Sequence, residues 1–329
     1  MNAPQSNPPD YSASADEHPA ATECLTVPSE YAGLRLDQTL VRLLPQHSRS
    51  RLQAWLREGR ISVAGLSCPD AKHKMWGGET ICVTAAADPA ANSHVAEEIA
   101  LSVLHEDQDL LVIDKPAGLV VHPGSGNWRG TLLNALLHHA PELSEIPRAG
   151  IVHRLDKETS GLLVVARTLA AQTDLVRQLQ ARSVKREYLA LVHGAVASAG
   201  SVDAPIARHP TQRTKMAVVA EQGKRGKEAR THYSVRERFA AATLLECRLE
   251  TGRTHQIRVH MASIKHPLVG DPVYGRRGGG NALLSAFPRQ ALHAWRLTLL
   301  HPRTHEEMSW ESSLPRDFAD LLDALRANP

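Results

Sequence analysis

The pattern of apolar and polar positions between residues 34 and 84 predicts a small module of two helices followed by two strands. In the first helix, apolar side chains at i, i+4, i+7 and i+8 line one face: Leu36, Leu40, Leu43 and Leu44. Pro45 ends this helix because proline lacks the backbone N–H that a helix interior needs. A second apolar stripe at Leu52, Trp55 and Leu56 precedes Gly59, a residue that favours the left-handed end of a helix. Residues 60–63 and the surroundings of Ile81 and Val83 then predict strands.

Beyond residue 100, short apolar runs alternate with amphipathic stretches. The runs predict strands at 101–104, 110–113, 162–165, 188–192, 244–249 and 291–301. The amphipathic stretches predict helices at 132–137, at 170–179 and near Leu321 to Leu325. Several of the strands are joined by links of hairpin length, which favours an α+β (mixed α/β) domain with a mixed sheet over a doubly wound one.

Two segments lack an apolar pattern. Residues 1–33 begin with a stretch rich in Pro, Ser, Ala and Asn, so ordering them gains little against the loss of backbone entropy, and we expect a disordered tail. The tail has neither the basic start and apolar stretch of a secretory signal nor the arginines of a transit peptide. Residues 85–100 are rich in Ala and contain Asp88-Pro89, which predicts a linker. The expected domains are therefore 34–84 and 101–329.

The composition is that of a globular protein with a large core, because 42% of the 329 residues are hydrophobic and 22% are charged. Nothing in the sequence predicts a membrane span. Four cysteines lie far apart and form no Cys-x-x-Cys pair: Cys24, Cys68, Cys82 and Cys247. This spacing supports neither a disulfide framework nor a zinc site, so a reducing cytoplasm is the expected compartment.

The net charge of +3 conceals an uneven distribution. The first 30 residues hold five acids and no Lys or Arg, so the rest of the chain carries 38 basic against 30 acidic side chains. This excess is compatible with a nucleic-acid partner. Six arginines lie between residues 33 and 60, against two acids, and they form either a solvated face or a phosphate-binding surface.

Asp156 is the candidate for chemistry that the local pattern singles out. It stands between Arg154 and Lys157 and just before the buried strand at 162–165. Nearby positive charge should hold this carboxylate ionised, and an ionised carboxylate can act as a nucleophile. The same residues also fit an Asp that caps the Thr159-Ser160-Gly161 turn while both cations face solvent, and the local pattern alone favours this second interpretation.

Four stretches together resemble the pseudouridine synthases that act on large-subunit ribosomal RNA, in order and in spacing. They are Lys115 to Gly124, His153 to Leu162, Lys185 to Tyr188 and Thr251 to His260. The resemblance covers about residues 34 to 315 and includes an S4-like RNA-binding module of helix, helix and strand in front. It implies a pseudouridine synthase fold, in which a central mixed, largely antiparallel sheet carries an active-site cleft across its middle.

The resemblance implies catalytic roles for Asp156, Tyr188 and Arg258. In that family the Asp is essential, the Tyr packs on the target uracil and the Arg is the basic partner of the Asp. The reaction is isomerisation of uridine to pseudouridine in 23S ribosomal RNA, and the helix 69 stem-loop is the expected site. It requires neither a metal nor a cofactor. The target base must be flipped out of its stack.

The resemblance also implies RNA contacts. Arg154 is expected to fill the gap that the flipped base leaves, and Arg253 and His122 lie in matching motifs. The S4-like module contributes Arg35, Arg49, Arg51 and Arg57, whose phosphate contacts position a protein without reading sequence. The basic segment 206–233 predicts an RNA-gripping arm with Arg208 and Lys215, or else a mobile surface hairpin. The partner is large-subunit ribosomal RNA, free or within a ribosomal particle, and the chain is expected to act as a monomer without contacting a membrane.

Several alternatives to this hypothesis follow from the same residues. The glycines at 124–130 do not follow the dinucleotide-binding spacing, and His255 and His260 are five apart, which no helix or strand places on one face of a metal site. Residues 275–280 predict a flexible basic loop. The functional alternatives are a catalytically silent ribosome-assembly protein, a synthase acting on a different rRNA or tRNA site, and a hydrolase using Asp156, for which no partner acid or Ser-His arrangement is evident.

Overall fold

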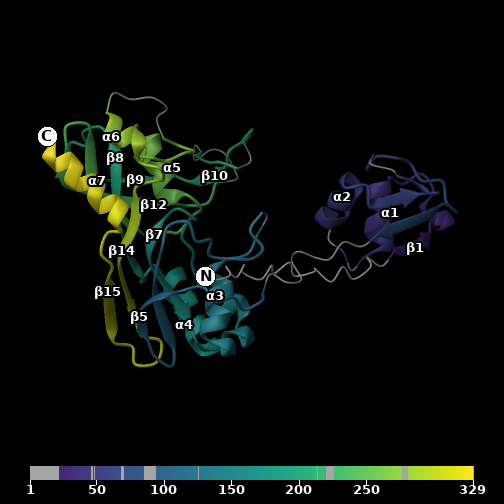
Figure 1. The fold of residues 1–329 in the computed structure, drawn as a ribbon, viewed down its shortest axis with the longest axis horizontal. Helices are drawn as coiled ribbons and strands as arrows, with labels where there is room; N and C mark the ends of the chain where they lie inside the picture. The colour runs from purple at the N-terminus through teal and green to yellow at the C-terminus, as the bar shows by residue number, and fades with distance from the viewer. Residues whose placement is uncertain are drawn as a thin grey trace, which may run out of the picture. The chain divides into compact units, whose positions relative to one another are not determined.

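The computed structural model describes residues 22–45, 47, 49–67, 70–84, 94–124, 126–212, 214–219, 226–275 and 281–328. The chain forms two compact units, residues 1–91 and residues 92–329 (Figure 1). Among the residues described, no helix is long and apolar enough to cross a membrane.

The first unit is an antiparallel sheet with two helices. The sheet has the order β1-β4-β2-β3, with strands Thr22–Thr26 (β1), Ile61–Val63 (β2), Leu66–Ser67 (β3) and Thr80–Thr84 (β4). A 3-10 turn Ser29–Tyr31 (η1) precedes the helices Leu36–Leu43 (α1) and Arg49–Arg57 (α2). The two predicted apolar stripes pack with Ile61 and Ile81 into one core cluster. The helices and strands that the spacing predicted here are therefore present.

Residues 22–33 belong to this unit, so the prediction that the tail continues to residue 33 is wrong for them. β1 pairs residue by residue with β4, from Thr22 opposite Thr84 to Thr26 opposite Thr80. Val27, just beyond it, is buried in the core cluster. β1 is ordered although it is poor in large apolar side chains, because the ladder with β4 provides partners for its backbone groups. Residues 1–21 lie outside the described residues.

Cys24 and Cys82 face each other in the β1–β4 ladder and form a disulfide, with their Cα atoms 4.1 Å apart. The expectation of no disulfide is therefore wrong for this pair. The two cysteines are 58 residues apart in the sequence, and only the strand register brings them together. Cys247 is a buried thiol whose pKa burial raises to about 12. Cys68 lies outside the described residues.

The second unit is built on a nine-stranded sheet with the order β5-β6-β7-β14-β8-β13-β12-β9, and β15 pairs with β14. Its strands are Ser102–Glu106 (β5), Leu110–Lys115 (β6), Ser160–Ala166 (β7), Lys185–His193 (β8), Gly200–Asp203 (β9), Arg230–Arg238 (β12), Ala242–Leu249 (β13), Leu292–Leu300 (β14) and Glu307–Glu311 (β15). All pairs are antiparallel except β7 with β14. The predicted α+β fold with a mixed, largely antiparallel sheet is confirmed.

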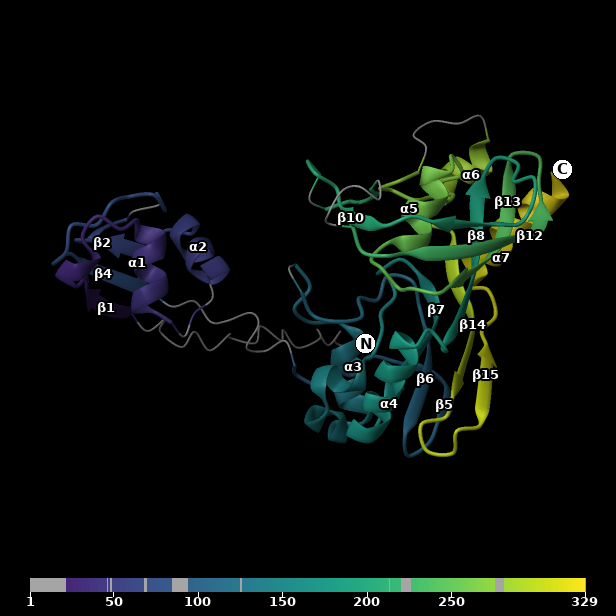
Figure 2. The ribbon, with the colours of Figure 1, turned by 180° about the vertical axis from the view of Figure 1, so that it is seen from behind.

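Helices cover this sheet on both faces (Figure 2). They are Leu132–His139 (α3), Leu169–Gln180 (α4), Gln256–Ser263 (α5), Ala282–Ala286 (α6) and Arg316–Ala327 (α7), with 3-10 turns Pro141–Glu145 (η2) and Pro147–Gly150 (η3). Alternate side chains of β6 and β7 enter two core clusters, one shared with α3 and one with α4. Likewise β8 and β13 share one cluster with α5 and another with α6 and α7. The strands that carry the candidate site are thus held from both sides.

Gly161 explains how β7 and β14 approach each other as the one parallel pair. Its φ of +109° is a conformation that residues with a side chain rarely adopt. A Cβ at this position would overlap the backbone of Ala294 on β14. The glycine that follows the Asp156 loop is therefore required for the strand contact that fixes the end of that loop.

Two predicted boundaries differ from the structure. Residues 94–100 pack on the second unit rather than forming the end of a linker, because Asn134 of α3 bonds the carbonyl of Val95 at 2.8 Å and the N–H of Glu97 at 3.0 Å. Residues 85–93 lie outside the described residues. The predicted arm contains an antiparallel hairpin of Ile206–Arg208 (β10) and Met216–Val218 (β11), but residues 230–233 belong to β12 of the main sheet. Of the predicted glycine-rich loop, residues 276–280 are outside the described part.

Candidate active site

Asp156 lies on the loop that leads into β7. Lys115, at the end of β6, holds this loop in place. The Lys115 side chain is fully buried, and its ammonium donates to three backbone carbonyls: Pro116 at 2.7 Å, Leu119 at 3.0 Å and Lys157 at 3.0 Å. Burial lowers the pKa of Lys115 to about 8. Since an ammonium carries three donors, the three carbonyls match its charged form.

Arg289 and Gln290 hold the same loop from the segment before β14, the strand that neighbours β7 on the edge opposite to β6. Arg289 donates to the carbonyl of Glu158 at 3.1 Å, while its Nε and Nη2 bind Asp317 at 2.7 and 2.8 Å. Gln290 donates to the hydroxyl of Thr159 at 3.3 Å. These bonds come from the segment before β14, about 130 residues further along the chain. The loop is therefore fixed by buried side chains at three successive residues, 157 to 159.

Arg258, on α5, reaches Asp156 directly. Its Nη1 donates to Oδ2 of Asp156 at 3.0 Å, and its side chain is only 5% exposed. Its Nε and Nη2 donate to the two oxygens of Asp271 at 2.7 and 3.0 Å. Burial opposes the charge on Arg258, but its two carboxylate partners outweigh burial and raise its pKa. The predicted pairing of Asp156 with Arg258 is present in the structure.

Asp271 was not identified from the sequence. Its side chain is completely buried, and besides Arg258 it accepts the N–H groups of Val273 and Tyr274 at 2.8 and 3.0 Å. Burial raises the pKa of this carboxyl, but the hydrogen bonds and charge of Arg258 outweigh burial, so the pKa lies below its ordinary value. Asp271 thus orients Arg258 toward Asp156.

His255 also approaches Asp156 and contacts Tyr274, although the sequence considered alone suggested His255 only as a possible metal ligand. The Nε2 of His255 lies 3.9 Å from Oδ1 of Asp156, and its Nδ1 lies 2.9 Å from the hydroxyl of Tyr274. That hydroxyl accepts the N–H of Met216 on β11 at 2.8 Å. Burial is the main cause that lowers the pKa of His255. His255 stands directly before α5 in a left-handed conformation, with φ of +56°.

Tyr188 lies on β8, both in the core cluster and at the wall of the cleft. It is 6% exposed, and burial raises the pKa of its phenol, with the charge of Arg186 opposing this shift and that of Asp156 adding to it. Tyr188 is therefore both a residue of the core and a residue of the cleft wall.

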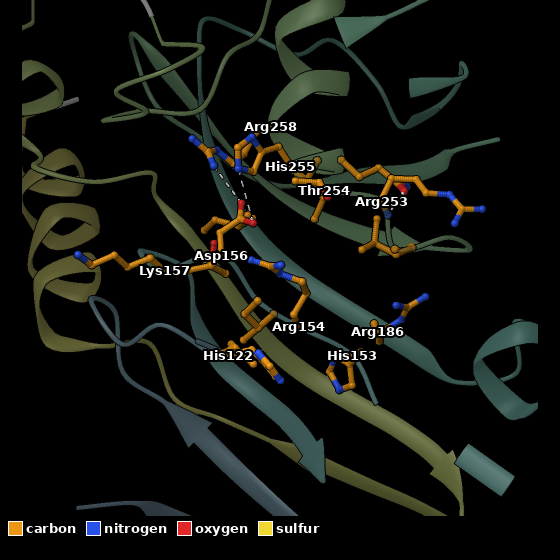
Figure 3. Close-up of a pocket in the computed structure, with 18 of the residues that line it drawn as sticks. His122, His153, Arg154, Asp156, Lys157, Arg186, Arg253, Thr254, His255 and Arg258 are labelled. Atoms are coloured by element: carbon orange, nitrogen blue, oxygen red, sulfur yellow. Dashed lines mark hydrogen bonds and ion pairs between the residues drawn. The ribbon is translucent and has the colours of Figure 1, made fainter. Parts of the chain in front are cut away.

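Of these residues, Asp156, Tyr188, His255 and Arg258 line one cleft of about 1190 Å³. The cleft also contains Arg154, Arg253 and His122 from the predicted RNA contacts. Figure 3 shows Arg258 and His255 directed at Asp156, with Arg154 beside them and Arg253 and Arg186 on the side away from Lys157. Six predicted residues thus meet in one place, although they come from four separate parts of the sequence.

The other predicted RNA-binding residues lie elsewhere. Arg208 and Lys215 belong to the β10–β11 hairpin region and do not line the cleft. In the first unit, Arg35 and Arg49 both pair with the buried Asp37, at 3.0 and 3.1 Å, and both are partly exposed. Arg51 stacks over Trp55 at 5.0 Å, and Arg57 donates to the carbonyl of Gln53. The guanidinium groups of these four arginines therefore make contacts within the unit as well as forming a basic surface.

One group of metal-ligand types occurs among the described residues, away from the cleft. Asp107, Asp109 and His301 offer ligand atoms within 4.8 Å of one another. Their atoms already have protein partners, since Asp107 is 3.2 Å from His301 and Arg303 binds both oxygens of Asp109 at 2.7 and 3.0 Å. A guanidinium in this position competes with a cation, so the group is an internal hydrogen-bond network.

Comparisons with known proteins agree on the kind of protein this chain resembles. A model of the RNA pseudouridylate synthase family matches residues 109–263. Ribosomal large subunit pseudouridine synthase D of Nitrosomonas europaea is 60% identical over 98% of this chain and 93% of its own length. The protein of the same name from Escherichia coli K12 is 50% identical over 92% of this chain and 94% of its own length.

Solved structures give the same result for the fold. Human RNA pseudouridylate synthase domain containing 4 is 28% identical, with a TM-score of 0.55 over 68% of this chain and 93% of that one. Human RNA pseudouridylate synthase domain containing 1 is also 28% identical, with a TM-score of 0.54 over 71% of this chain and 98% of that one.

Proposed function

Because the chain belongs to the RNA pseudouridylate synthase family, we propose that it converts specific uridines of 23S large-subunit ribosomal RNA to pseudouridine. The observation that carries this proposal is the carboxylate of Asp156, held at 3.0 Å by an arginine that Asp271 orients from behind. The isomerisation breaks the bond between N1 and C1′ of the nucleotide, turns the base and joins C5 to C1′.

Asp156 is the nucleophile in this proposal. Its Oδ2 accepts the bond from Arg258, whereas Oδ1 accepts no hydrogen bond from the described residues and has His255 at 3.9 Å. Oδ1 is therefore the oxygen available for attack, either at the sugar or at the base after a glycal has formed. Arg258 keeps the carboxylate in place without blocking this oxygen.

The proton balance of the reaction assigns a task to Tyr188. Forming the new carbon–carbon bond releases the proton of C5, and N1 gains a proton in the product. The reaction is redox-neutral, so it requires no redox cofactor. A phenol carries its proton at neutral pH, and burial raises the pKa of Tyr188 further. We assign to Tyr188 stacking on the uracil and proton transfer, in which its hydroxyl gives its proton to N1 and the resulting phenolate accepts the proton that C5 loses.

The cleft accepts a nucleotide only when its base has left the stack. Flipping out a base costs a few kcal/mol (about 2–4), and contacts with the RNA must offset this cost. Arg154, exposed beside Asp156, is positioned to enter the gap in the stack, and Arg253 and His122 line the same cleft. We assign these three residues to RNA contacts around the target.

The first unit is proposed to be an S4-like RNA-binding domain. Its two helices stand before strands β2, β3 and β4 in the expected order, and its arginines Arg35, Arg49, Arg51 and Arg57 lie on and beside these helices. Arg208 and Lys215 of the hairpin region would add phosphate contacts. Such contacts position a protein on RNA without reading its sequence.

The finer parts of the proposal concern the target and the setting. We propose the helix 69 stem-loop as the target, in free or ribosomal RNA, and a chain that acts as a monomer. The proposed compartment is the cytoplasm, where ribosomal RNA is made into subunits. The Cys24–Cys82 disulfide opposes this assignment, because disulfides are rare in reducing compartments. The proposed substrate, ribosomal RNA, decides the assignment to the cytoplasm despite this disulfide.

Tritium release from ribosomal RNA labelled at C5 of uridine tests the proposed function. Isomerisation expels this tritium into water, whereas binding alone does not. We expect release with the wild type and none above background with Asp156→Asn, which keeps the shape of the side chain but removes its charge. Asp320→Asn, on the exposed surface of α7, is the matched control and should act like the wild type.

Three outcomes would contradict parts of this proposal. If the wild type binds ribosomal RNA without releasing tritium, the chain is a catalytically silent RNA-binding or ribosome-assembly protein. If Asp156→Asn remains active, the nucleophile is another residue. If pseudouridines mapped in cells with and without the protein differ outside helix 69, the enzyme acts on a different rRNA or tRNA site.

A further inference from the structure

Arg186 is a buried cation without a counterion among the described residues. It is 8% exposed, and its Nε is buried without a hydrogen-bond partner. A guanidinium does not lose its proton in proteins, so Arg186 remains charged. A charge that is removed from water and left unpaired is costly, and proteins pair such charges or use them.

The other buried arginines show what is missing at this position. Three arginine side chains are buried in the described part of the chain: Arg186, Arg258 and Arg289. Arg258 binds both oxygens of Asp271, and Arg289 binds both oxygens of Asp317. Arg186 has no carboxylate in the corresponding role, so its partner must come from outside the described protein.

Arg186 faces the cleft. It lies two residues before Tyr188 on β8, and alternate residues of a strand point to the same face, so both line the cleft. The intervening Glu187 points to the other face, where it pairs with Arg248 at 3.0 Å and with Arg296 at 3.4 Å. Figure 3 shows Arg186 on the same side of the cleft as Arg253.

The space around Arg186 depends on a glycine from a different motif. A Cβ at Gly252 would come within 2.6 Å of Nη1 of Arg186. Gly252 directly precedes Arg253, in the segment that also carries His255 and Arg258. The absence of a side chain at residue 252 thus leaves room for the guanidinium at the wall of the cleft.

We propose that Arg186 binds one backbone phosphate of the RNA strand in the cleft, that of the target uridine or of its immediate neighbour. This inference rests on the proposed function and adds a ligand contact to it. RNA brings the anion that Arg186 lacks, and the planar fork of a guanidinium matches two phosphate oxygens. Strand geometry places Arg186 about 7 Å from Tyr188, which restricts the contact to a phosphate close to the stacked base. The contact forms only when the nucleotide has entered the cleft.

Neutral phosphates test the contact. Stem-loop RNAs would each carry a single uncharged methylphosphonate at one position around the target uridine, and single-turnover rates would be measured at subsaturating enzyme. We expect Arg186→Gln to lower this rate roughly 10- to 100-fold on unmodified RNA. One methylphosphonate position should lower the wild-type rate by the same factor and have no further effect on Arg186→Gln. The slope of log affinity against log salt should fall by about 1 in the variant.

Matched variants separate this role from others. Arg248→Gln makes the same substitution at an exposed arginine on β13 and should stay within twofold of the wild type at every RNA. Arg186→Lys keeps the charge and should show an intermediate loss at the same methylphosphonate position. If Arg186→Gln does not fold, the wild-type scan compared with that of Arg186→Lys still decides the question.

Three results would overturn the proposal while the proposed function stands. One is a wild-type rate that no single methylphosphonate changes. Another is that the rate losses caused by Arg186→Gln and by the methylphosphonate multiply at every position, because the two changes then act independently. The third is a variant defect that appears only as a shifted pH profile, which would mean that Arg186 acts on the ionisation of Tyr188. If the wild type releases no tritium from ribosomal RNA, the proposed function itself has failed first.

Discussion

Arg258 and Asp271 form a buried, two-pronged ion pair, with bonds of 2.7 and 3.0 Å, that leaves one guanidinium nitrogen directed at Asp156. Asp271 is fully buried and lies in a turn that it stabilises by accepting two backbone N–H groups. The position of the proposed nucleophile therefore depends on a carboxylate that never touches the substrate.

Asp271→Asn should weaken both stability and activity. Removing one partner of a buried ion pair costs about 3 kcal/mol, so the free energy of unfolding at pH 7 should fall by about that amount. The pKa of Asp271 is lower in the folded protein than in the unfolded chain, so its contribution is present above about pH 4 and is lost as the pH falls further. Urea unfolding at pH 7 and at about pH 3.5 measures the loss of stability and its dependence on pH. Equal stability of variant and wild type at pH 7 would show that the pair contributes nothing.

Tyr188→Phe keeps the ring and removes only the hydroxyl. If this hydroxyl transfers a proton, the single-turnover rate should fall roughly a hundredfold or more, the usual size of a general acid–base effect. RNA affinity should change little, because the stacking surface remains. A variant with full activity in its folded fraction would identify Tyr188 as core packing only.

Lys115→Met should disturb the Asp156 loop, because three carbonyls lose their donor. The rate should fall at least tenfold (about 1.4 kcal/mol in the barrier), with less change in RNA affinity. In the wild type, the rate should also fall as the pH rises through about 8, where the ammonium loses its third donor. Lys115→Met should lack this alkaline decrease.

The unfolding free energy of the wild type should show the opposite trend with pH. The pKa of Lys115 is about 8 in the folded protein and about 10.5 when unfolded, so the unfolded chain binds more protons between these values. This group therefore makes stability increase with pH in that interval, by about 3 kcal/mol in total. Urea unfolding of wild type and Lys115→Met between pH 7.5 and 10 isolates the difference. A parallel dependence in both proteins would assign it to other groups.

Removing residues 1–84 should separate RNA binding from chemistry. All four catalytic motifs remain, and the two units have separate core clusters. If the first unit contributes about three phosphate contacts, the slope of log affinity against log salt should become shallower by about 2 to 3. The shortened chain should still convert RNA at high concentration. Unchanged affinity and slope would contradict the S4-like assignment, and unfolding of the remainder would contradict the independence of the second unit.

Local patterns predicted most of the elements because helix and strand periodicities depend on neighbouring residues. β1 was missed because it gains its order from β4, which its own composition does not reveal. β15 was missed for the same reason, as it forms on the edge of β14. The parallel pairing of β7 with β14 requires Gly161 and Ala294, which are far apart in the sequence.

The site was predicted in part because its motifs resemble a known family. The local pattern singled out Asp156, whereas its catalytic role and the choice of Arg258 and Tyr188 came from that resemblance. The structure brings all three to one cleft. Asp271 was not predicted, because the sequence Asp-Pro-Val-Tyr has the composition of an ordinary turn. His255 was tested only for the spacing of a metal ligand.

The bonds from Arg289 and Gln290 to the Asp156 loop have a consequence for biosynthesis. They span 131 residues, and Asp317, which holds Arg289, lies 28 residues further along the chain. Contacts this distant in sequence form after the local helices and hairpins, because a long loop must close first. A nascent chain thus has Asp156 and the strand behind it long before it has the segment that fixes them. The loop that carries Asp156 therefore stays without these bonds until the chain has emerged as far as Asp317 and β14 has docked.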